Sequence, residues 1–165
     1  MKTPERNETC LTLQRFFSED DMQIGVETSK AVDQRRVFVI DEDEITRAVL
    51  QFMLQDEIET HEHANPEDAF QSTNEWLKPN VILLGATFLT ARGTGLISEL
   101  AERFQGVRII IVHDTAEEDI ALAGMKAGAH GALSKPLRVE AVRKKVDTIL
   151  GRGGAAPLVQ LGFMN

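Results

Sequence analysis

The pattern of hydrophobic and polar positions changes at residue 36. Residues 1–35 are mixed and polar, with one modest apolar cluster at Leu11, Leu13, Phe16 and Phe17. Beyond residue 36, short apolar runs alternate with longer segments in which apolar residues recur every three or four positions. Such runs are typical of strands covered on both faces, and the longer period is typical of amphipathic helices. We therefore divide the chain into an N-terminal extension (1–35), one domain (36–150) and a C-terminal tail (151–165).

This alternation predicts five strand–helix units. The expected strands are residues 37–40, 58–63, 81–84, 107–112 and 131–133. Four of the expected helices are residues 44–55, 95–104, 117–127 and 137–150. A further helix is expected to begin at Asn65 and Pro66. Residues 86–94 are expected to form a loop. In the helix 44–55, the signature is a stripe of Ile45, Val49, Phe52 and Met53. Strands that alternate with helices form a parallel sheet with right-handed crossovers, so the predicted fold class is α/β, doubly wound.

Chemically distinctive residues follow the ends of the expected strands. Asp41 and Glu42 follow the first strand, Gly85 the third, His113 the fourth and Lys135 the fifth. The carboxyl ends of parallel strands share one edge of the sheet, and ligands of such sheets bind beyond that edge. We expect these five residues to form the functional site.

This arrangement resembles the response-regulator receiver domain over residues 36 to about 150. The resemblance rests on Val39-Ile40-Asp41-Glu42-Asp43, on Ala64-Asn65-Pro66-Glu67-Asp68-Ala69, and on Ala127-Gly128-Ala129 followed by Ser134-Lys135-Pro136. It implies a flavodoxin-like (βα)5 fold with a five-stranded parallel sheet. It also implies that Asp41 and Glu42 correspond to an acidic pair that holds Mg²⁺, and Lys135 to a lysine that contacts phosphate.

The sequence departs from the family pattern at three positions. Gly85 stands where a phosphate-accepting aspartate ends the third strand, His113 where Thr or Ser is usual, and Ala132 where a switching aromatic residue is usual. The segment 86–94 also lacks the usual Met-Pro. Because glycine has no oxygen to accept a phosphoryl group, we interpret the chain as a degenerate receiver (pseudo-receiver) that regulates without phosphorylation and is not an enzyme.

The site then has two carboxylates in place of three, which lowers its need for a cation. We expect weak or no Mg²⁺ binding at Asp41 and Glu42, no other cofactor or metal, and an ion pair between Lys135 and Asp41 or Glu42. Two alternatives stay open. A displaced acceptor, either Asp43 or Asp114, would leave a working phosphotransfer regulator. A small anion held by Lys135 would make the vacant space beside Gly85 a sensor.

Receiver domains signal through the face formed by their last two helices and last strand. The corresponding residues here are Glu118, Ala121, Met125, Lys126, Ala132, Arg138 and Arg143. The resemblance implies a partner in two-component signalling or a phosphorelay: a histidine kinase, another regulator or a larger complex. A second copy of the chain is also a plausible partner through this face.

Composition excludes several other classes. A chain of 165 residues is too short for a receiver plus a full effector domain, and a net charge of −8 disfavours general nucleic-acid binding. No apolar stretch approaches the ~20 residues of a membrane span. The first residues lack the apolar core of a signal peptide, and Cys10 is the single cysteine, so we expect a cytoplasmic protein.

Overall fold

The computed structural model describes residues 33–152 with the exception of residue 75, so the apolar cluster at residues 11–17 and most of the C-terminal tail lie outside the described residues. The strands are β1 (Asp33–Ile40), β2 (Ile58–His63), β3 (Val81–Gly85), β4 (Arg108–His113) and β5 (Gly131–Ser134). The helices are α2 (Glu44–Leu54), α3 (Pro66–Ser72), α4 (Ala86–Arg92), α5 (Gly95–Arg103), α6 (Glu118–Lys126) and α7 (Val139–Leu150), with a 3₁₀ turn, η2 (Thr115–Glu117).

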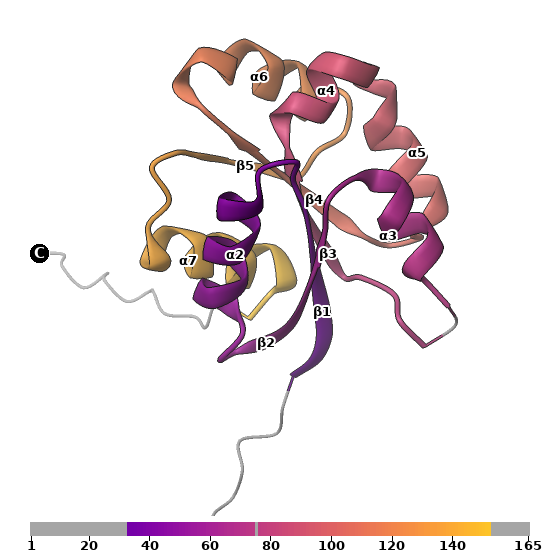
Figure 1. The fold of residues 1–165 in the computed structure, drawn as a ribbon, viewed down its shortest axis with the longest axis vertical. Helices are drawn as coiled ribbons and strands as arrows, with labels where there is room; N and C mark the ends of the chain where they lie inside the picture. Colours follow the sequence, from indigo (N-terminus) through magenta and orange to yellow (C-terminus); the bar gives the residue numbers. More distant parts are fainter. Residues whose placement is uncertain (1–32, 75, 153–165) are drawn as a thin grey trace, which may run out of the picture. The chain divides into compact units, whose positions relative to one another are not determined.

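The five strands form one parallel sheet in the order β2-β1-β3-β4-β5. Helices α2 and α7 cover one face, and α3, α4, α5 and α6 cover the other (Figure 1). This arrangement confirms the predicted doubly wound α/β fold with a five-stranded parallel sheet. Among the described residues, none of the helices is long and apolar enough to cross a membrane.

The core consists of two apolar layers, one on each face of the sheet. Side chains alternate along β1, so that Phe38 and Ile40 enter one layer whereas Val37 and Val39 enter the other. Burial on both faces explains the consecutive apolar residues 37–40 of β1, 81–84 of β3 and 109–112 of β4. The register of the strands sets the positions of the residues that follow each strand.

Local capping places the helix ends close to the predicted positions. The side chain of Asn65 accepts a hydrogen bond from the Asp68 amide at 2.8 Å, and Pro66 occupies the first turn of α3, as predicted. Gly151 ends α7 in the left-handed conformation, with φ of 71°. β1 begins three residues earlier than the expected boundary at residue 36.

One expectation about the helices is wrong, and one apolar stripe is exposed. Residues 86–92 form helix α4 and not a loop, because Ala86 and Leu89 lie one turn apart and both pack into the core. The stripe of α2 that carries Ile45, Val49 and Phe52 does not face the core. Ile45 is 72% exposed and Phe52 is 69% exposed, while Thr46, Leu50, Met53 and Leu54 are the buried positions.

Candidate functional site

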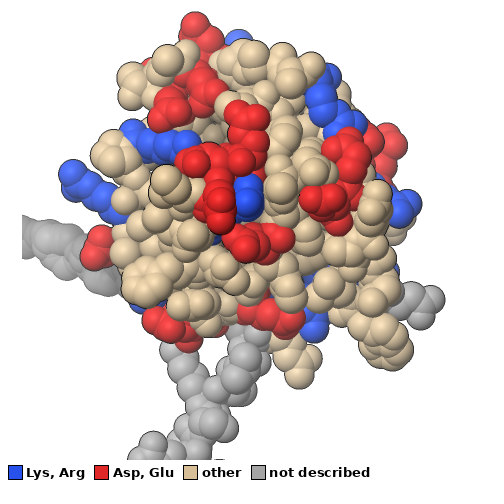
Figure 2. Space-filling view, in the orientation of Figure 1, with Lys and Arg blue, Asp and Glu red and all other residues tan. Residues whose placement is uncertain are grey.

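The sheet brings the predicted site residues to its carboxyl edge. In the strand register, Ile40 of β1 lies opposite Leu84 of β3, and Gly85 lies opposite Val112 of β4. The residues that come after these positions, Asp41 and His113, therefore lie on either side of Gly85. Figure 2 shows acidic side chains gathered over the segment between β1 and α2, with basic atoms beside them.

The Asp41 carboxylate occupies the space next to Gly85. A Cβ atom added to Gly85 would lie 2.7 Å from Asp41 Oδ2 and 3.0 Å from its Cγ, closer than such atoms approach. Asp41 is only 4% exposed, and its Oδ1 accepts a hydrogen bond from the Asp43 amide at 2.9 Å. Burial raises the pKa of the Asp41 carboxyl group, and the Asp43 hydrogen bond and the positive charge of Lys135 oppose that rise. The carboxylate thus lies where a side chain at position 85 would start.

The two neighbouring acids have different roles. Asp43 is the N-cap of α2, and its oxygens accept hydrogen bonds from the amides of Ile45 and Thr46, both at 3.2 Å, and from the Thr46 hydroxyl at 2.6 Å. The Thr46 hydroxyl is the main cause that lowers the pKa of Asp43. Glu42 is exposed, and Arg47 donates to its backbone carbonyl at 3.1 Å. Asp43 is therefore a structural cap.

Lys135 pairs with Asp114, and the predicted ion pair with Asp41 or Glu42 is wrong. Lys135 Nζ lies 3.9 Å from Asp114 Oδ2, and no ion pair joins Lys135 to another acid among the described residues. The reason is the strand order: Asp114 follows β4, which adjoins β5, whereas β3 and β4 separate β1 from β5. Asp114 also belongs to a capping box with Glu117, a spacing that is visible in the sequence and would have placed it at the turn.

His113 and Ala132 are held by local contacts. His113 is buried, and its Nδ1 lies 2.9 Å from the Asp114 carbonyl oxygen. Ala132 is partly buried and packs against the apolar layer that includes α4 and α6. The small Ala132 side chain offers no ring that could turn between an inward and an outward position.

The residues of the predicted interaction face differ in their exposure. Glu118, Met125, Lys126 and Arg138 are exposed. Ala121 is 2% exposed and faces the core, because it lies on the inner side of the amphipathic helix α6.

Arg143 likewise does not belong to this face, because it is directed to the end of α2. Its Nε donates to the Met53 carbonyl at 2.7 Å, and its guanidinium pairs with Glu57 at 3.3 Å and with Asp56 at 3.8 Å. Leu122, three residues before Met125 on α6, is 54% exposed and was not among the predicted residues.

The resemblance implies Mg²⁺ at this edge, and the donor set does not fit that ion well. Mg²⁺ needs hard oxygen ligands with free lone pairs in octahedral positions. Asp43 uses its oxygens to cap α2, the Asp41 carboxylate is buried beside Gly85, and position 85 offers no carboxylate. Within residues 33–152, residue 75 aside, no group of three or more His, Cys, Asp or Glu side chains is arranged to hold a metal ion.

Comparison with known proteins agrees with this architecture. The chain is 26% identical over 117 residues to the chemotaxis protein CheY of Halobacterium salinarum, a match that covers 70% of this chain and 97% of that protein. A response regulator from Thermotoga maritima has a similar fold, with a TM-score of 0.63 and 23% identity over 71% of this chain and 98% of that one. The receiver domain of NtrX from Brucella abortus has a TM-score of 0.63 and 19% identity over 70% of this chain and 98% of that one. The model of the response regulator receiver domain matches residues 37–147, and the chain therefore belongs to that family.

Proposed function

We propose that this chain is a phosphorylation-independent receiver that acts as a protein-interaction module in two-component signalling, without enzymatic activity. The observation that carries the proposal is the pair of Gly85 and Asp41. Gly85 ends β3 without a side chain, and the Asp41 carboxylate lies where that side chain would begin. Position 85 therefore offers no oxygen to which a phosphoryl group can be transferred.

The displaced acceptor is less favoured, because each candidate carboxylate already has a structural role. Asp43 caps α2 and Asp114 caps η2 while it pairs with Lys135. Asp41 is buried, so an incoming phosphodonor would have little access to it. Phosphorylation of any of the three would remove existing hydrogen bonds before it formed new ones.

The small-anion alternative is also less favoured. Asp41, Glu42 and Asp43 surround the carboxyl end of β1 with negative charge, and Lys135 is the lysine expected to hold an anion there. Because Lys135 already lies near Asp114, an anion beside Gly85 would meet the Asp41 carboxylate first. Like charges at such short range disfavour binding.

The partner surface that we propose is the exposed side of α6. Leu122 and Met125 supply apolar area, and Glu118, Lys126 and Arg138 supply charges around it. Receiver domains interact with histidine kinases and other proteins, and a kinase or another regulator is the partner class that we propose here. With Ala132 in place of a mobile ring, binding depends on the partner's concentration, because no ligand distinguishes two states of this face.

The proposal is tested by incubation of the chain with acetyl phosphate and Mg²⁺, followed by intact-mass measurement. A receiver that retains an aspartate at the corresponding position serves as the positive control. We expect the control to gain one phosphoryl group and this chain to gain none. A Mg²⁺-dependent gain by this chain that disappears in Asp43→Ala, Asp114→Ala or Asp41→Ala would establish a displaced acceptor and overturn the proposal.

The partner surface is tested by copurification from the native cell followed by mass spectrometry. We expect Leu122→Ser to remove the signalling partner from the copurified set, while the matched variant Phe52→Ser on α2 retains it. Loss with Phe52→Ser and retention with Leu122→Ser would contradict the α6 surface. Sedimentation of the purified chain identifies the case in which the partner is a second copy.

A further inference from the structure

Helix α2 carries an apolar stripe, formed by Ile45, Val49 and Phe52, that the described residues leave exposed. Two of its side chains are more than two-thirds exposed: Ile45 at 72% and Phe52 at 69%. The three residues share one side of the helix because they are four and three positions apart. Contiguous apolar side chains with polar residues at the rim, here Glu44 and Gln55, are typical of interaction sites. The α2 stripe therefore needs an occupant.

The described part of the chain ends beside this helix. In the last described residue, Arg152, Nη2 lies 3.9 Å from Oε2 of Glu57, which follows the end of α2 by three residues. Arg143 of α7 also donates to the Met53 carbonyl near the end of α2, at 2.7 Å. Helices α2 and α7 thus lie side by side on one face of the sheet (Figure 1). The residues that follow Arg152 therefore start within reach of the Phe52 end of the α2 stripe.

The C-terminal tail has the composition of an apolar binding segment. Residues 153–165 contain no Asp, Glu, Lys, Arg or His, in a chain of which 27% is charged. Its large apolar side chains include Leu158, Val159, Leu161 and Phe163. A segment without charged side chains can enter an apolar contact without the free-energy cost of removing an ion from water. The tail and the α2 stripe are therefore chemically matched.

The tail is also long enough to cover the stripe. The chain between Arg152 and Leu158 can span roughly 20 Å when extended. The α2 stripe is about 10 Å long from Ile45 to Phe52, because a helix rises about 1.5 Å per residue. Residues 158–163 span roughly 16 Å when extended. They can therefore lie along the whole stripe.

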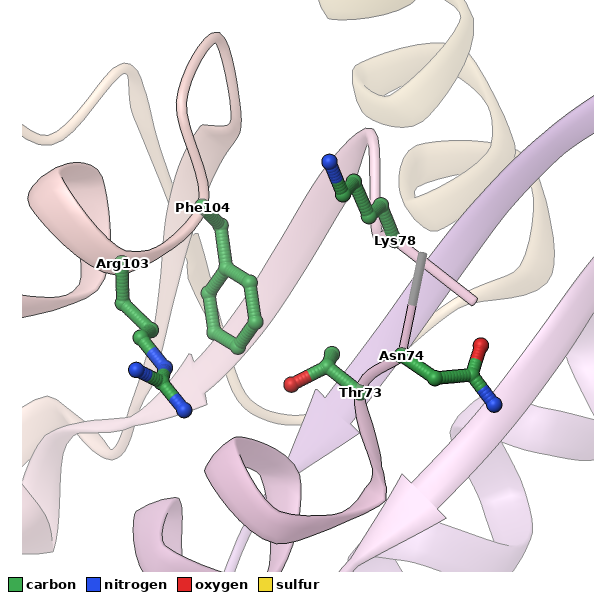
Figure 3. Close-up of a pocket in the computed structure, with 5 residues that line it drawn as sticks. All are labelled: Thr73, Asn74, Lys78, Arg103 and Phe104. Carbon is green, nitrogen blue, oxygen red and sulfur yellow. The ribbon is translucent and has the colours of Figure 1, made fainter. Parts of the chain in front are cut away.

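The pocket between the ends of α3 and α5 is less suited to this segment. It lies on the opposite face of the sheet and is lined by Thr73, Asn74, Lys78, Arg103 and Phe104 (Figure 3). Lys78 and Arg103 are cationic, whereas the α2 stripe has no charged residue. An uncharged apolar segment would bring nothing to pair with these cations, so the α2 stripe is the favoured site.

We propose that residues 158–163 of the C-terminal tail dock on the α2 stripe and shield it from other proteins. Because the tail is tethered beside α2, docking requires no encounter between separate molecules. Ordering of the tail costs conformational entropy, which offsets much of the gain, so docking changes the free energy of unfolding little. The contact lies on the outer side of α2 and does not involve Gly85 or Asp41. It therefore holds or fails independently of the function proposed above.

Paramagnetic broadening of NMR signals in the ¹⁵N-labelled full chain tests the contact. A spin label is attached at Asn165→Cys in a Cys10→Ser background, because Cys10 is the single cysteine of the chain. We expect a loss of amide signal intensity at Ile45 and Val49, in the part of α2 farther from Arg152. Amides of α6, on the opposite face of the sheet, should keep their intensity.

Matched variants separate docking from mere proximity of the tail. Phe163→Ser and Phe52→Ser should each abolish the broadening at Ile45, because each removes an aromatic side chain from the contact. Gln160→Ser in the tail and Leu122→Ser on α6 are the controls and should leave the broadening unchanged, since they alter a polar tail residue and an exposed residue of the opposite face. An unchanged pattern of amide signals from the strands shows that each variant is folded.

The proposal is overturned if Ile45 and Val49 keep their intensity in the full chain, or if Leu122→Ser reduces the broadening as much as Phe52→Ser does. A second experiment mixes the spin-labelled chain, without ¹⁵N, with a ¹⁵N-labelled chain that carries no spin label. We expect no broadening of α2 in this mixture. Broadening there would assign the α2 stripe to the tail of a second copy and overturn the contact within one chain.

Discussion

The Asp41 carboxylate is the residue-scale feature that distinguishes this site. It is buried at the end of β1, held by the Asp43 amide, and adjacent to a glycine that leaves room for it. Burial removes the carboxylate from water, and one amide hydrogen bond offsets only part of the free-energy cost. Gly85 and Asp41 are therefore coupled, and the coupling can be measured.

A methyl group at position 85 is expected to destabilise the protein through Asp41. Gly85 has an ordinary φ of −64°, so the cost of Gly85→Ala arises from the contact at 2.7 Å and not from the backbone. We expect a loss of about 1–3 kcal/mol in the free energy of unfolding, measured by urea denaturation. In an Asp41→Ala background the loss should shrink, with a coupling of at least about 0.5 kcal/mol. Equal losses in both backgrounds would rule out a contact between the two positions.

Asp41 also predicts a pH dependence of stability. Its pKa in the folded protein is raised above 3.8 because burial penalises the charged form. The folded state therefore binds this proton more tightly than the unfolded state, and the associated stability is lost as pH rises through the folded pKa. Asp41→Asn should stabilise the protein near neutral pH, on the order of 1 kcal/mol, and the gain should vanish as the pH falls toward 3.8.

Denaturation curves of the wild type and Asp41→Asn over a pH series provide the measurement. Glu102→Gln, which replaces an exposed acid on α5, is the matched control and should show no such trend. A gain for Asp41→Asn that grows toward acid pH would have the wrong sign and refute the assignment.

At the scale of the elements, α6 packs closely against the core because position 124 is a glycine. A Cβ atom at Gly124 would lie 2.3 Å from Cδ1 of Ile111, 3.0 Å from Cδ1 of Leu89 and 3.2 Å from Cδ1 of Ile97. These side chains come from β4, α4 and α5, and all three are buried. The close approach of α6 to the core therefore depends on the absence of a side chain at this position.

Gly124→Ala is expected to lower stability although alanine is the better helix former. The helix preference favours alanine by about 1 kcal/mol, and overpacking of a dense core costs about 1–3 kcal/mol. Gly95→Ala at the start of α5 is the matched control, since no atom lies within 4 Å of its added Cβ. We expect Gly95→Ala to be neutral or stabilising in thermal unfolding. A rise in Tm for Gly124→Ala would show that the neighbouring side chains repack without cost.

The helices and strands were predictable where the hydrophobic pattern and the capping or turn residues indicate the same boundaries. The apolar runs of β1, β3 and β4 and the Asn65-Pro66 start of α3 are local signals, and the structure agrees with them. Helix α4 was missed because it has only seven residues and no side-chain cap. The apolar stripe correctly predicted helix α2, but periodicity does not show whether another element covers an apolar face.

The sequence predicted which residues lie at the carboxyl edge of the sheet, but it did not predict which of them form an ion pair. Strand ends alone place Asp41, Gly85, His113 and Lys135 at one edge. The partner of Lys135 depends on strand order and on the turn after β4, which bring it to Asp114. The position of the Asp41 carboxylate beside Gly85 depends on side-chain packing, which the sequence pattern does not encode.

At the scale of the whole domain, stability is concentrated in the two layers that flank the sheet. Phe38 is fully buried at the centre of one layer, and its ring meets those of His61, His63 and Phe104. Phe52 is of the same residue type but lies exposed on α2. The same substitution at these two positions should therefore have very different consequences.

We expect Phe38→Ala to cost about 3–5 kcal/mol, because it leaves a large cavity between the sheet and α5. Phe52→Ala should change stability by no more than about 0.5 kcal/mol, since it removes little buried area. Thermal unfolding followed by circular dichroism measures both. A comparable loss for Phe52→Ala would mean that another part of the chain covers α2.

The close fit of Asp41 against Gly85 has an evolutionary consequence. A single codon change from glycine to aspartate at position 85 would meet the carboxylate of Asp41 before any phosphoryl group could arrive. Two buried acids in contact would repel each other until Asp41 rotated away from its present amide partner or an added cation neutralised them. A gain of aspartate at position 85 would therefore first lower the stability of the protein, and selection for stability would favour the glycine.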